Sequence, residues 1–145
     1  MYERILVPLD GSALAEAALA HAVQMAEIFQ AELLLLRAVI VPTFPGDDTT
    51  AATRAVLAES KTYLQSIART LQLRGLHIRT VVRTGKAAET IVEYAVQQEV
   101  SVIVMATHGH HGGDRWPLGS IAEKVLRSMQ VPVLLIRATQ GVESP

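Results

Sequence analysis

The stretch ATHGHHGGDRWPLGS, residues 106–120, concentrates glycine and histidine between two patterns of regular structure. It follows an apolar run typical of a buried strand, and it ends at Gly119-Ser120, where a helical pattern begins. Unpaired backbone N–H groups and the helix dipole favour an anion at such a helix start, so a phosphate-binding loop is one interpretation. The stretch matches neither G-x-x-x-x-G-K-[ST] nor G-x-G-x-x-G, so the pattern by itself is weak evidence for a nucleotide.

Ser120 and the glycines of this stretch also have local interpretations. Ser120-Ile121-Ala122-Glu123 matches the capping box S-x-x-E, in which the serine hydroxyl satisfies an amide of its own helix. Gly109 and Gly119 could let the backbone approach a ligand closely, or could adopt a positive φ. Backbone amides can bind phosphate while a hydroxyl caps, so the residues alone leave both roles open.

Three histidines in the same stretch, His108, His110 and His111, suggest a metal site at first sight. Neighbouring histidines on a glycine-rich loop seldom converge on one ion, and no acidic residue has a suitable spacing, so we expect no protein-bound metal. His108, nearest the strand, could hydrogen-bond a phosphate or only the loop backbone. Ser120 lacks the G-x-S-x-G frame of a hydrolase nucleophile, so that chemistry is not indicated.

Asp10 is the second candidate for binding chemistry. It ends the apolar run RILVPL and is followed by Gly11 and Ser12. A carboxylate at the end of a buried strand can accept hydrogen bonds from ribose hydroxyls or from an adenine amine. The alternative is an Asx turn or a helix cap within the Asp-Gly-Ser sequence, and the two interpretations are equally supported.

The elements that must position these residues alternate regularly along the chain. Apolar runs predict strands at residues 4–9, 32–41, 76–85, 100–106 and 133–137, and helical spacing predicts helices from Ser12 to near Phe29 and at residues 51–73, 86–98 and 120–129. This order predicts an α/β fold of parallel strands with helices on both faces. In a sheet ordered 3-2-1-4-5, the loops after the first and fourth strands flank one crevice.

Composition fits one globular domain and excludes several classes of protein. The chain has 145 residues, of which 50% are hydrophobic and 19% charged, and its formal net charge is −1, so it carries no basic footprint for nucleic acid. No apolar stretch approaches the roughly 18–20 residues of a membrane helix. The chain has no cysteine, which excludes thiol chemistry, and its opening residues show no signal-peptide pattern, so we expect a cytoplasmic protein.

The segments ILVPLDGS and ATHGHHGGDRWPLGSIAEKVLRSMQVPVLLIR together resemble the universal stress protein family. The first resembles its opening strand and turn, and the second its motif of Gly-x-x-Gly, nine residues, then Gly-Ser. The resemblance covers essentially the whole chain. It implies a single-domain Rossmann-like or flavodoxin-like fold over residues 1–140, followed by a short tail at 141–145.

The resemblance also implies a bound adenine nucleotide, ATP, ADP or AMP, with any Mg²⁺ held by the phosphates. Carried over by position, the site residues fall into three groups. The adenosine group is Pro8, Asp10 and the backbone of Ala38; the ribose and phosphate group is Met105, Ala106, His108 and Gly109; the phosphate group is Gly119, Ser120 and Ile121.

The resemblance implies a homodimer in which the last strands, Val133 to Arg137, pair with each other. The function implied is that of a dimeric, ATP-binding sensor or regulator of the stress response. Ala106 stands where the motif has its first glycine, and a branch of the family without the glycine motif does not bind ATP. A dimeric interaction module without nucleotide is therefore the alternative. Slow ATP hydrolysis is a weaker hypothesis, because no base is clearly positioned to activate water and His108 is the only nearby candidate.

Overall fold

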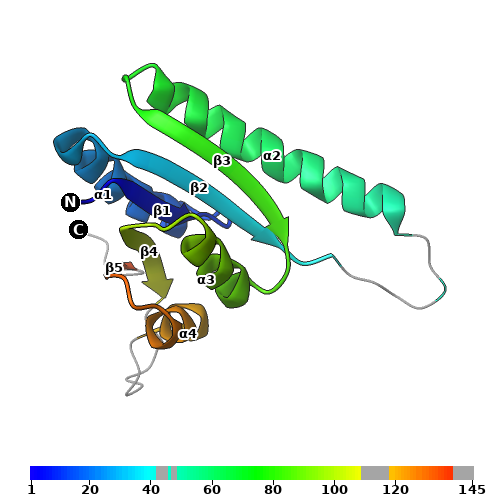
Figure 1. The fold of residues 1–145 in the computed structure, drawn as a ribbon. Helices are drawn as coiled ribbons and strands as arrows, with labels where there is room; N and C mark the ends of the chain where they lie inside the picture. The colour runs from blue at the N-terminus through cyan, green and yellow to red at the C-terminus, as the bar shows by residue number, and fades with distance from the viewer. Residues whose placement is uncertain (42–45, 47–48, 109–117, 139–145) are drawn as a thin grey trace, which may run out of the picture.

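Strands and helices alternate along residues 1–41, 46, 49–108 and 118–138, which are the residues that the computed structural model describes (Figure 1). The elements are β1 (Arg4–Pro8), α1 (Ala13–Phe29), β2 (Glu32–Val39), α2 (Thr50–Gln72), β3 (His77–Thr84), α3 (Ala87–Gln97), β4 (Val102–His108), α4 (Ser120–Ser128) and β5 (Val133–Ala138). The predicted elements are confirmed with shifts of one or two residues at most ends. β4 continues to His108 because it stays paired with β5 as far as Ala138.

The five strands form one parallel sheet in the order β3-β2-β1-β4-β5, which confirms the predicted topology. β3 lies at one edge and is only half-buried, which agrees with its mixture of polar and apolar residues. β2 and β3 pair over their full length, from Glu32 to Val39. β1 and β4 pair only at Ile5 with Val102 and at Leu6 with Ile103, and the ladder then ends. The two strands therefore separate toward their carboxyl ends, at the point where the strand order reverses.

Both faces of the sheet are covered by helices, and alternate strand residues enter two separate cores. Ile5, Leu33 and Val104 belong to a cluster with residues of α1 and α2, whereas Leu6, Leu34 and Ile103 belong to a cluster with residues of α3 and α4. Figure 1 shows these two pairs of helices on opposite sides of the sheet. Burial on both faces explains why the central strands are almost continuously aliphatic. None of the helices in the described ranges is long and apolar enough to span a bilayer.

The helix starts confirm one predicted cap and correct another. Ser12 caps α1, because its Oγ accepts a hydrogen bond from the Ala15 amide at 3.1 Å, with Glu16 in the first turn. The capping box predicted at Ser120 is wrong: the N-cap of α4 is Gly119, with φ −68° and ψ 161°, and the Glu123 amide donates to its carbonyl at 3.0 Å. Ser120 is the first residue inside the helix, and Gly119 does not use a positive φ.

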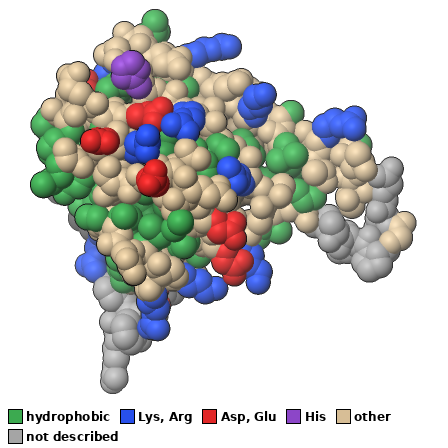
Figure 2. Space-filling model, viewed as in Figure 1, with side chains coloured by type: hydrophobic (Ala, Val, Ile, Leu, Met, Phe, Trp, Pro, Cys, Tyr) green, Lys and Arg blue, Asp and Glu red, His purple; other side chains and the backbone are tan. Residues whose placement is uncertain are grey.

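The face of the molecule seen in Figure 2 carries side chains of both charge signs. Some surface charges of the described chain form ion pairs: Arg79 Nη2 lies 2.9 Å from Glu32 Oε1, and Arg74 Nη2 lies 3.0 Å from Glu27 Oε2. Exposed pairs of this kind contribute little to stability. This face therefore has a mixed potential rather than a field of one sign.

Candidate functional site

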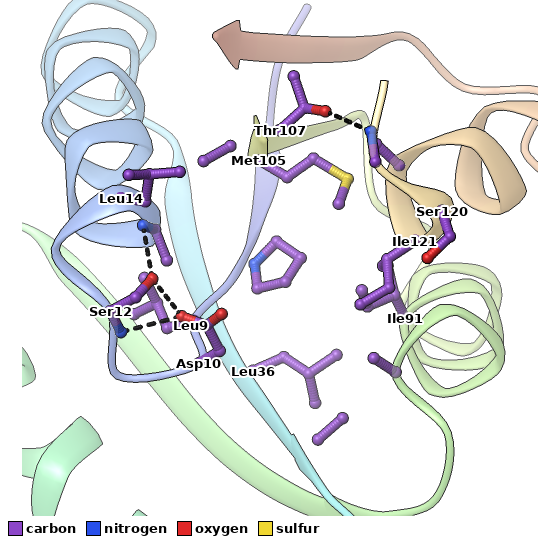
Figure 3. Close-up of a pocket in the computed structure, with 17 residues that line it drawn as sticks. Leu9, Asp10, Ser12, Leu14, Leu36, Ile91, Met105, Thr107, Ser120 and Ile121 are labelled. Atoms are coloured by element: carbon purple, nitrogen blue, oxygen red, sulfur yellow. Dashed lines mark hydrogen bonds between the residues drawn. The ribbon is translucent and has the colours of Figure 1, made fainter. Parts of the chain in front are cut away.

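A cavity of about 320 Å³ opens where β1 and β4 separate (Figure 3). Its walls come from the β1–α1 turn, the carboxyl ends of β2 and β4, and the first turns of α1, α3 and α4. The volume is at the lower end of the range of small-molecule sites. The cavity lies at the carboxyl edge of the sheet, where ligands of open parallel sheets bind.

Most of the cavity wall is apolar. The apolar lining residues are Pro8, Leu9, Leu14, Ala15, Leu36, Ala38, Ala87, Ile91, Met105, Ala106, Ile121 and Ala122. In Figure 3, Met105 and Leu36 border the cavity between two polar corners, with Asp10 and Ser12 on one side and Ser120 on the other. This arrangement suits a ligand with a flat apolar body and polar groups at its ends.

The first polar corner is a compact turn after β1. Asp10 Oδ1 accepts a hydrogen bond from the Ser12 amide at 2.9 Å and another from the Ser12 hydroxyl, so the Asx turn considered from the sequence is present. Gly11 has φ +89°, which favours glycine at this position. A carboxylate can accept about four hydrogen bonds, so the turn is compatible with further acceptance by Asp10 from a ligand.

Side chains from three elements support this turn from behind. The Arg37 guanidinium lies under Gly11, where a Cβ would come within 3.4 Å of Nη1, and its Cζ is 5.1 Å from the centre of the Tyr63 ring. The Tyr63 hydroxyl donates to Glu16 Oε2 at 2.9 Å. Burial, and then this hydrogen bond, raise the pKa of the Tyr63 phenol above its ordinary value, so the phenol remains a donor. Arg37, Tyr63 and Glu16 therefore form a connected group of contacts next to the turn.

The second polar corner is the start of α4. The Gly119 amide donates to Thr107 Oγ1 at 3.0 Å, which ties the helix start to the end of β4 (Figure 3). Ser120, Ile121 and Ala122 form the first turn of α4, where amides have no acceptor within their own helix. All three residues line the cavity. This end of the cavity therefore carries main-chain donors and the positive end of a helix dipole.

Comparison with known proteins agrees with this architecture. The family model described as the universal stress protein family matches residues 1–137. The chain belongs to the universal stress protein family. It is 31% identical to universal stress protein MJ0531 of Methanocaldococcus jannaschii over 141 residues, covering 94% of this chain and 83% of that protein. The solved structure of hypothetical protein MJ0577 from the same organism superposes with a TM-score of 0.79 at 26% identity, covering 97% of this chain and 99% of that chain.

Two more distant universal stress protein structures are described as nucleotide complexes. One is a complex with cAMP, with a TM-score of 0.73, 21% identity and coverage of 93% of this chain and 97% of that chain. The other, from Archaeoglobus fulgidus, is a complex with dAMP, with a TM-score of 0.65, 18% identity and coverage of 92% of this chain and 97% of that chain. At these identities the likeness to this universal stress protein is one of fold.

The structure brings most of the sequence-predicted site residues of this universal stress protein into the one cavity. Those that line it are Pro8, Asp10, Ala38, Met105, Ala106, Gly119, Ser120 and Ile121. The His108 side chain and Gly109 lie outside the described residues, as do His110 and His111. Among the residues that are described, no three His, Cys, Asp or Glu side chains form a group that could hold a metal ion.

Sequence reasoning missed several lining residues. They are Leu9, Ser12, Leu14, Ala15, Leu36, Ala87, Ile91, Thr107 and Ala122. Ser12, Leu14 and Thr107 adjoin predicted residues and could have been found by extending the two loops. Ala87 and Ile91 follow β3, at the edge of the sheet, and nothing in their own segment indicates that α3 begins beside the cavity.

The alanine at the first motif position fits the universal stress protein backbone without strain. The described non-glycine residues with positive φ are Gln30 and Glu99, so Ala106 is not among them. Ala106 is extended within β4 and pairs with Ile136 of β5. The difference from glycine at this position is therefore one methyl group in the cavity wall, not a forbidden conformation.

Proposed function

We propose that this universal stress protein binds an adenine nucleotide in the cavity between β1 and β4 and acts as a dimeric, nucleotide-responsive regulator in the stress response. The single observation that carries the proposal is the pairing of two polar corners across one apolar cavity. Asp10 lies at one corner, and the first turn of α4 with Ser120 and Ile121 lies at the other. The cAMP and dAMP complexes of distant family members support the choice of ligand class.

Each part of the ligand has a matching part of the cavity. The adenine ring is flat and largely apolar, and it suits the wall that includes Leu36 and Met105. Ribose hydroxyls can donate to the Asp10 carboxylate. Phosphate oxygens can accept from the amides of Ser120 and Ile121 at the positive end of α4. Any Mg²⁺ is held by the phosphates, because Mg²⁺ in nucleotide sites commonly keeps several waters and few protein ligands.

Calorimetric titration with AMP, ADP, ATP and adenosine is the direct test. We expect the phosphorylated ligands to bind more tightly than adenosine, because they add contacts to the α4 start, and we expect GMP to bind more weakly than AMP. Mass spectrometry of small molecules released from freshly purified protein provides an independent check. Absence of binding by every adenine ligand up to millimolar concentration would contradict the proposal.

The second candidate, a dimeric interaction module without nucleotide, is favoured by Ala106. Its methyl group occupies cavity space that glycine would leave open. We expect Ala106→Gly to change the AMP affinity by less than about fivefold, since the methyl adds little volume, and to cost about 0.5–1 kcal/mol of stability as a glycine within a strand. Titration and chemical denaturation measure the two effects. If AMP binds only to Ala106→Gly, the native protein belongs to the second class.

The dimer is the third part of the proposal. β5 is the last strand of the sheet and pairs on one side with β4, so its other edge remains open within the described chain. Leu134 on this strand is an exposed large hydrophobic residue. Pairing of Val133 to Arg137 with the same segment of a second copy would satisfy that edge and cover Leu134. A cytoplasmic location, expected from the sequence, belongs to the same proposal.

A further inference from the structure

Thr107 is a buried polar residue whose hydroxyl contacts the start of α4. The residue is 3% exposed and lies one position before the end of β4. Its Oγ1 accepts the amide of Gly119 at 3.0 Å, across a separation of 12 residues. The hydrogen bond therefore joins the end of β4 to the start of α4.

The acceptor belongs to a rigid part of the fold. β4 is paired with β5 on both sides of Thr107, at Ala106 with Ile136 and at His108 with Ala138. The donor, by contrast, belongs to Gly119, the N-cap of α4, which has no side chain of its own to cap the helix. Thr107 thus supplies the polar contact that joins the helix start to the sheet.

This contact has two consequences for the cavity. It removes the Gly119 amide from the donors that a ligand can use, because that amide already has an acceptor. It also fixes the direction in which the next amides, those of Ser120 and Ile121, present themselves, since they follow Gly119 in the first turn. Preorganised donors bind an anion without the entropic penalty of ordering them first.

We propose that Thr107 is the positioning residue for the phosphate end of the cavity, acting through Gly119 on the amides of Ser120 and Ile121. The inference rests on the proposed function, because it assigns those amides to a phosphate. Thr107 keeps its own hydroxyl hydrogen after accepting from Gly119. Its main effect is nevertheless on the helix start. Removal of the Thr107 hydroxyl should therefore weaken binding of the phosphate part of the ligand and not of the nucleoside part.

The experiment compares Thr107→Val, which keeps the shape and removes the hydroxyl, with Thr107→Ser, which keeps the hydroxyl. Calorimetry measures the affinities of AMP and adenosine for each protein. We expect Thr107→Val to weaken AMP about tenfold, because the amides of Ser120 and Ile121 must then be ordered when the ligand binds, and to leave adenosine unchanged. Thr107→Ser should restore AMP binding to near the native level. Equal weakening of AMP and adenosine, no weakening of AMP, or tighter AMP binding would each overturn the inference.

Amide hydrogen exchange in the ligand-free proteins separates this inference from the proposed function. The Gly119 amide should exchange slowly in the native protein and in Thr107→Ser, and faster in Thr107→Val. Equal exchange in all three proteins overturns the inference whatever the nucleotide result. If the native protein binds neither AMP nor adenosine, the proposed function fails, and the phosphate role of Thr107 fails with it.

Discussion

Gly119→Val is expected to weaken AMP and ATP binding by roughly 100-fold, the effect of filling space that a ligand must occupy. Gly119 is the N-cap of α4 and lines the cavity. A side chain at an N-cap lies over the amides of the second and third helical residues, here Ile121 and Ala122. Valine has no acceptor for these amides, so its methyl groups shield the Ile121 amide, one of the two donors that we propose for phosphate. The effect follows from the position of the cap and needs no distortion of the helix.

The backbone at this position accepts a β-branched residue. With φ −68° and ψ 161°, Gly119 has an extended conformation that valine adopts readily, so a loss of affinity in Gly119→Val would not come from backbone strain. Circular dichroism and thermal unfolding check that the fold is intact, and calorimetry measures the affinity. An unchanged AMP affinity would contradict the proposed role of the α4 start.

Two matched variants test the explanation. Gly119→Ser adds a hydroxyl that accepts the same amides, so it should also weaken AMP, by competition, while leaving the helix at least as stable. Thr49→Val changes the N-cap of α2, which makes no side-chain cap and does not line the cavity, so it should leave AMP unaffected. Equal losses in Thr49→Val and Gly119→Val would show that the loss is not specific to the cavity.

The topology and the position of the cavity could be predicted because they depend on patterns that single segments carry. Leu33 to Leu36 are at most 1% exposed, and a run of four such residues predicts a strand covered on both faces. Alternation with helices then predicts a parallel sheet. The rule that ligands bind where the strand order reverses placed Asp10 and Ser120 at one crevice, and both line the cavity.

The supporting contacts could not be predicted because they join residues that only the fold brings together. Tyr63 and Glu16 are 47 positions apart, on α2 and α1, and Arg37 on β2 contacts the Tyr63 ring. The error at Ser120 has a similar origin. A capping box at Ser120 and a cap at Gly119 differ by one residue in where the helix begins. Gly119, which is the N-cap in the structure, donates its amide to Thr107, and the local sequence does not reveal this contact.

Leu134→Asp is expected to weaken the proposed dimer by about 100-fold or more, because it replaces a leucine that the proposed interface would bury with a carboxylate that loses its water there. Leu134 is 39% exposed on β5, whose outer edge is the proposed interface. Antiparallel pairing about a twofold axis places the residue-134 side chains of both copies on the same face of the joined sheet. The variant therefore puts two carboxylates where the proposed dimer would bury two leucines.

Sedimentation equilibrium measures the dissociation constant of the native protein and of the variant. Because Leu134 is already partly exposed in the single chain, Leu134→Asp should keep the circular dichroism spectrum of the native fold while losing association. Leu73→Asp is the matched control: Leu73 is 91% exposed at the end of α2 and lies apart from β5 in sequence and sheet order, so its replacement should leave the dimer intact. A native protein that is monomeric, or a Leu134→Asp protein as dimeric as the native one, would rule out β5 as the interface. AMP affinity in the Leu134→Asp monomer then tells whether the cavity between β1 and β4 binds the nucleotide without the partner.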